Sequence, residues 1–170
     1  MTVTRVLLNT IVVLTSLVLQ LSVVNPLDLP GGGPDLVVLA LAALAFVQGE
    51  LPGAVTGFAA GLLLDLVPPA DGLVGRWALV LCLTGYVAGR LGPLVRDSAI
   101  RVVAAVAGLA AGSVLAFAGL SLLFGDVSLT AGSVGSVALA SAGYDVFLTP
   151  FVVPALMGLA RRAEPETQRL

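Results

Sequence analysis

The chain has 170 residues, of which 58% are hydrophobic and only 11% are charged, whereas soluble domains carry about a quarter charged residues. This composition excludes an ordinary soluble domain and predicts a membrane protein. All eight basic residues are arginines and none lies in a run longer than two, so the basic footprint of a nucleic-acid-binding protein is missing.

The first apolar stretch, about residues 4–24, is predicted to be a retained membrane span. It is longer than the core of about 7–15 residues in a secretory signal peptide. It also ends in Asn25-Pro26, without an A-x-A-like cleavage site. The prolines and glycines of residues 30–34 then predict a loop.

Residues 34–67 allow two interpretations. Two apolar runs flank Glu50, and each is short for a span, which needs about 20 residues. They could form two short spans joined by a tight turn at residues 48–53, where Pro52 suits the first turn of a helix. They could also form a re-entrant hairpin that does not cross fully. We prefer two spans, because this divides the arginines more cleanly between the two sides.

The remainder predicts three longer spans, of which the last is interrupted by Pro150 and Pro154 and should be kinked or broken. The chain is thus predicted to be an all-α integral membrane protein, with a single transmembrane domain at 1–160 and a polar cytoplasmic tail at 161–170. Its six predicted spans cover about residues 4–24, 34–48, 51–67, 75–92, 101–124 and 131–159.

The arginines predict the orientation. Six spans place seven of the eight arginines on the side of the two termini and only Arg76 on the other side. Because loops rich in basic residues stay in the cytoplasm, both termini are expected to be cytoplasmic.

Glycines spaced four residues apart form the first motif. Such spacing lines one helix face with small residues and lets a neighbouring backbone approach closely. The face could pack inside the bundle or bind another membrane protein, and the spacing does not separate these alternatives. The glycines of this candidate face are Gly53, Gly57, Gly61, Gly85 and Gly89, and Gly108 and Gly112 repeat the spacing.

Two carboxylates are the candidate polar sites. Asp65, at the end of the third predicted span, could be solvated, cap the following loop, pair with Arg76 or face a pocket. Asp145 is the only acidic residue well inside a predicted span, where a carboxylate is costly unless neutralised or paired and marks function by default. Tyr144 and Thr149 could supply it with hydrogen bonds. Asp145 could be protonated or contact water in a cavity that the Pro150 kink opens, or Asp145 and Tyr144 could form a pocket or partner site.

The sequence predicts no catalytic, cofactor-binding or metal-binding residues. With no histidine and the single cysteine Cys82 in an apolar segment, soft-metal sites are nearly excluded and a Ser/His pair is impossible. No phosphate-binding or dinucleotide-binding glycine motif occurs. We therefore expect a protein that is not an enzyme and that works within the lipid bilayer.

The stretch from Pro52 to Leu66 resembles the bacterial rod shape-determining protein MreD family. Members carry a G-F-x-x-G-L-x-x-D-like element in an early span, which Gly57 to Asp65 match here, followed by a G-Y-x-x-G-like element, which Gly85 to Gly89 match. The arginine-only, Ala/Gly/Val-rich composition suggests the actinobacterial type.

The resemblance implies a scaffold in the bacterial cell membrane, belonging to the cell-wall elongation machinery (the elongasome). Such a protein acts in cell shape and peptidoglycan synthesis with an MreC-like protein and a glycosyltransferase/transpeptidase complex. It also implies a compact fold similar to the S component of energy-coupling-factor transporters. The alternative function is therefore an S-component-like vitamin-binding subunit. Against it, the first predicted span has no alanine between Thr4 and Val24 to form the helix face that such binders present to their coupling subunit.

Overall fold

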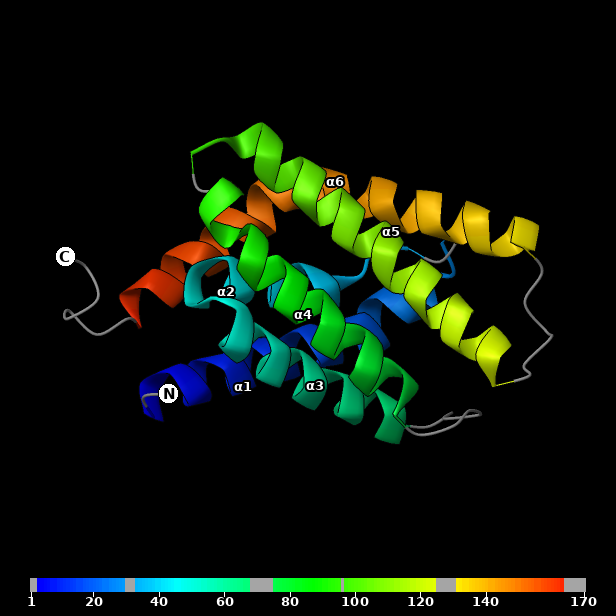
Figure 1. Cartoon of the computed structure of the whole chain (residues 1–170), viewed down its shortest axis with the longest axis horizontal. Coiled ribbons are helices and arrows are strands. Elements are labelled where there is room, and N and C mark those ends of the chain that lie inside the picture. Colours follow the sequence, from blue (N-terminus) through cyan, green and yellow to red (C-terminus); the bar gives the residue numbers. More distant parts are fainter. Residues whose placement is uncertain (1–2, 30–32, 68–74, 96, 125–130, 164–170) are drawn as a thin grey trace.

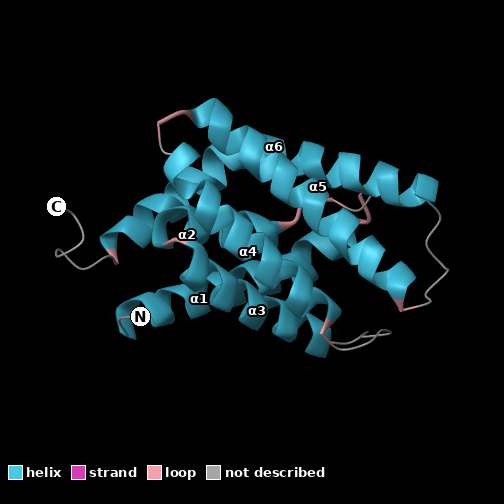
Figure 2. Cartoon of the chain, viewed as in Figure 1, coloured by secondary structure: helices cyan, strands magenta, loops and turns pink. Residues whose placement is uncertain are grey.

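The computed structural model describes residues 3–29, 33–67, 75–95, 97–124 and 131–163, and all the regular structure in these residues is helical (Figures 1 and 2). The prediction of an all-α membrane protein is confirmed. The helices are α1 (Val3–Leu19, continued by a π-helical turn at Gln20–Val24 and a 3-10 turn at Asn25–Leu27), α2 (Leu36–Gln48), α3 (Glu50–Leu66), α4 (Arg76–Val95), α5 (Ala99–Leu123) and α6 (Ala131–Arg162).

Helix α2 forms the centre of the bundle. It contacts α1, α3, α4, α5 and α6, and none of its residues from Val37 to Val47 is more than 7% exposed. A helix that is apolar on every side, as this one is, belongs in an interior. Successive helices run in alternating directions, so the start of α1 and the end of α6 lie at the same end of the bundle (Figure 1).

Among the described residues, four helical stretches are long and apolar enough to cross a membrane: Val3–Leu27, Arg76–Val95, Ala99–Leu123 and Val134–Arg162. Their outward surfaces carry large apolar side chains such as Leu7, Leu79 and Phe147, as a lipid-facing surface requires.

The segment that the sequence left ambiguous forms two separate helices, α2 and α3, joined at Gly49. This glycine has a φ of 93°, in the left-handed region, and lets the chain reverse between the helices. At about 1.5 Å per residue, α2 is only about 20 Å long, short of the roughly 30 Å of a hydrocarbon core. Two full crossings by this pair stay a prediction.

The glycines of the candidate face lie between α3 and α4. A Cβ atom on Gly53 would overlap the backbone of Gly85, and one on Gly57 would overlap the backbone of Leu81. In the same way, Gly61 lies against Trp77. Each contact needs hydrogen in place of a side chain, so these glycines set the close approach of the two helices. By contrast, Gly108 and Gly112 on α5 have no such neighbour within 4 Å.

Helix α6 is continuous through Pro150 and Pro154, so the broken helix considered from the sequence is not formed. The helix instead changes direction in its middle, between its orange and red parts (Figure 1). A proline removes one backbone hydrogen bond and crowds the preceding turn, which explains a bend here.

Candidate functional site

Asp65 caps the start of α4. Its carboxylate accepts hydrogen bonds from the backbone N–H groups of Gly75 (2.9 Å), Trp77 (3.2 Å) and Ala78 (3.0 Å). The first N–H groups of a helix have no partner within it, and Gly75, which precedes α4, has no side chain to cap them. Asp65 therefore caps a neighbouring helix from the end of its own.

Arg76 does not pair with Asp65, contrary to one possibility raised by the sequence. Its Nη1 donates to the Ser121 hydroxyl on α5 at 3.0 Å, and its guanidinium lies 5.1 Å from the centre of the Phe117 ring. Trp77 stacks on the same ring, with centroids 4.4 Å apart. Arg76 thus joins α4 to α5.

Asp145 of α6 binds the residue that caps α2. Its Oδ1 accepts the backbone N–H of Asp35 at 2.8 Å, while Asp35 Oδ1 accepts the N–H groups of Val37 (3.1 Å) and Val38 (3.0 Å). Asp145 is 0% exposed, and its Oδ2 has no hydrogen-bond partner among the described residues. We call this pair of carboxylates at the start of α2 the Asp35–Asp145 junction.

The donor to the Asp145 carboxylate is neither Tyr144 nor Thr149, the two residues expected from the sequence. The Thr149 hydroxyl donates to the backbone carbonyl of Asp145 at 2.6 Å rather than to its carboxylate, and Tyr144 is half-buried beside it. The donor found, the Asp35 N–H, is 110 residues away along the chain, so no local pattern could have indicated it.

Gln20, in the turn that continues α1, also forms hydrogen bonds at the start of α2. Its Nε2 donates to the Pro34 carbonyl (3.1 Å) and its Oε1 accepts the N–H of Leu36 (2.8 Å). Gln20 begins the π-helical turn, a local widening of a helix that is frequent at functional sites. Gln20 is one of two amide side chains in the first apolar span, with Asn9, and these amides were the sequence signal for its role.

A cavity of about 370 Å³ lies beside the junction, at the end of the bundle opposite the start of α1. We call it the Asp35 cavity. The polar residues of its lining are Gln20, Asn25 and Asp35. The full lining is Gln20, Leu21, Asn25, Asp35, Val37, Leu64, Val67 and Trp77.

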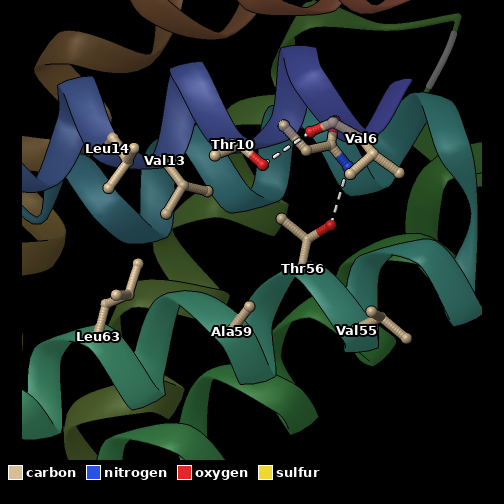
Figure 3. Close-up of a pocket in the computed structure, with 9 residues that line it drawn as sticks. Val6, Thr10, Val13, Leu14, Val55, Thr56, Ala59 and Leu63 are labelled. Carbon is tan, nitrogen blue, oxygen red and sulfur yellow. Dashed lines mark hydrogen bonds between the residues drawn. The ribbon is translucent and has the colours of Figure 1, made fainter. Parts of the chain in front are cut away.

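A second polar cluster joins α1, α2 and α3 near the other end. Asn9 Nδ2 donates to Gln48 Oε1 and to Thr56 Oγ1, both at 2.9 Å, and Gln48 Nε2 donates back to Asn9 Oδ1 at 2.7 Å. Asn9 and Thr56 also line a mostly apolar groove of about 220 Å³ between α1 and α3, and Figure 3 shows Thr56 in it. These amides tie the peripheral α1 to the core.

Within the described ranges, no three acidic, histidine or cysteine side chains gather to hold a metal ion. The described polar side chains cap helices and link them, while apolar side chains cover much of the outside. This arrangement defines the class as an α-helical membrane protein whose polar groups serve contacts between helices.

The family model of the rod shape-determining protein MreD matches residues 1–162. The chain therefore belongs to the MreD family, and its role lies in rod shape determination. No curated protein and no solved structure matches the chain. The expected likeness to the S component of energy-coupling-factor transporters is accordingly not confirmed.

Proposed function

We propose that this chain is a non-enzymatic membrane scaffold of the cell-wall elongation machinery. It holds an MreC-like protein and the glycosyltransferase/transpeptidase complex together during peptidoglycan synthesis. The observation that carries the proposal is the match to the MreD family over residues 1–162. The structural use of the described polar residues supports it, because Asp65, Gln20 and Asn9 all join one helix to another.

The proposed location is the bacterial plasma membrane, with several crossings and both termini in the cytoplasm. Arg5, Arg90, Arg101 and Arg161 support this orientation, because they lie toward the bundle end where α1 starts and α6 ends. Arg76 lies at the start of α4, toward the opposite end.

Affinity purification tests the scaffold. The tagged chain, expressed in its own host and solubilised in a mild detergent, should recover an MreC-like protein and a wall transpeptidase, and depleting the chain should make rod-shaped cells round. The Gly57→Leu variant, which disturbs the α3–α4 contact, should recover less of both, whereas Gly108→Leu should behave as the unaltered chain does. Recovery of a transporter ATPase module without wall-synthesis proteins would refute the proposal.

A further inference from the structure

The Asp35–Asp145 junction places the side chain of Asp35, which lines the cavity, where no described cation pairs with it. Asp35 is half-buried and Asp145 fully buried, and no described arginine forms an ion pair with either carboxylate. The start of α2 contributes a partial positive charge of about one half, which is less than the full negative charge of the Asp35 carboxylate alone. Buried charges in proteins are as a rule paired with an opposite charge.

The basic residue closest in sequence to the cavity lining is already engaged. Arg76 precedes Trp77, which lines the cavity, but its guanidinium bonds Ser121 and lies over Phe117 on α5. Asp35 uses only Oδ1 in capping α2, so its second oxygen, Oδ2, has no hydrogen bond from a described residue. Asp35, a residue of the cavity lining, therefore has a carboxylate without a partner of opposite charge from the described part of the chain.

The size and lining of the cavity indicate the kind of cation. A volume of about 370 Å³ is many times that of a single metal ion, and the described residues provide no group of three metal-ligating side chains. Leu21, Leu64 and Trp77 supply apolar lining beside the polar residues. The lining thus combines polar and apolar groups, and small-molecule sites likewise use a few polar groups to orient a ligand against apolar walls.

We propose that the Asp35 cavity binds a small organic cation, an ammonium or guanidinium group on a short apolar stem. The Asp35 carboxylate is its counter-ion, the amides of Gln20 and Asn25 border its polar end, and the Trp77 ring covers its stem. This site is additional to the scaffold role and does not depend on it.

Thermal unfolding of the purified full-length protein tests the site. n-Butylamine, agmatine and choline are titrated at constant ionic strength, with sodium chloride and butyrate as controls. Binding to the folded state alone should give a saturable rise of the unfolding midpoint, on the order of 5 °C at saturation, with at least one of the three cations and with neither control. The absence of a saturable rise with all three would overturn the proposal.

Variants test whether the rise of the unfolding midpoint comes from binding in the Asp35 cavity. Asp35→Asn keeps a side-chain oxygen to cap α2 but removes the charge, so the cation should bind at least about tenfold more weakly. Glu50→Gln removes a charge from the opposite end of the bundle, where Glu50 lies 3.6 Å from Arg90, and should leave binding unchanged.

A third variant, Val67→Trp, fills the rim of the cavity without changing any charge and should abolish the shift even if Asp35→Asn folds poorly. A rise that is equal in Val67→Trp and the unaltered chain would show that the cation binds elsewhere and would overturn the assignment.

Discussion

Asp65 and Asp145 both place a carboxylate among apolar helices, but their hydrogen bonds differ. Asp65 has three backbone N–H donors from the start of α4, so both of its oxygens are occupied. Asp145 has one donor, the N–H of Asp35, and its second oxygen is buried without a described partner. Asp65 therefore stabilises a helix end, while Asp145 joins α6 to the start of the central helix.

Substitutions of Asp145 should distinguish the contribution of its side-chain oxygen, as a hydrogen-bond acceptor, from the contribution of its negative charge. Asp145→Asn keeps an oxygen for the Asp35 N–H and should change insertion and stability little. Asp145→Ala leaves that N–H without its acceptor, which costs about 1–3 kcal/mol. Unfolding of both variants in a detergent series would measure the difference. Equal stability of the two would mean that the hydrogen bond at 2.8 Å contributes nothing.

Asp65→Ala should destabilise the protein through the start of α4, by about 1–2 kcal/mol, because the loss of a helix cap leaves N–H groups unpaired. Asp65→Asn should recover part of the loss, since an amide oxygen can still accept. Hydrogen exchange at Trp77 and Ala78 reports on these bonds directly. Unchanged exchange rates in Asp65→Ala would contradict the capping role.

At the scale of elements, the glycines of α3 and α4 show what a repeat can and cannot predict. The spacing of Gly53, Gly57 and Gly61 predicts a face that a backbone can approach, and the structure has α4 on that face. The same spacing at Gly108 and Gly112 has no close neighbour. A periodic pattern specifies which residues share a face, whereas the packing of the other helices decides what covers it.

A matched pair of substitutions tests this difference. Gly57→Leu pushes a side chain into the backbone of Leu81 and should force α3 and α4 apart, costing about 1–3 kcal/mol or more. Gly108→Leu meets open space on α5 and should be tolerated. Size-exclusion chromatography in detergent measures the folded yield. Similar yields of the two variants would argue against a tightly packed α3–α4 contact.

At the scale of the whole molecule, the alternating helices predict opposite exposure of the two bundle ends. In a Cys82→Ala background, an impermeant thiol reagent added to intact cells should label Asn25→Cys and not Glu50→Cys, because the second lies at the end assigned to the cytoplasm. Permeabilised cells, in which both should react, provide the control. Labelling of Glu50→Cys alone in intact cells would reverse the proposed orientation.

The sequence by itself determined the membrane class, the helical content, the family element at Gly57 to Asp65 and the glycine faces. These follow from composition and short-range periodicity, which act within one helix. Only the tertiary structure decided that α2 is the buried centre, that Asp65 caps α4, and that Asp145 meets Asp35 beside a polar cavity. The reason is physical: these contacts join residues that are distant in the chain, and the packing of whole helices brings them together.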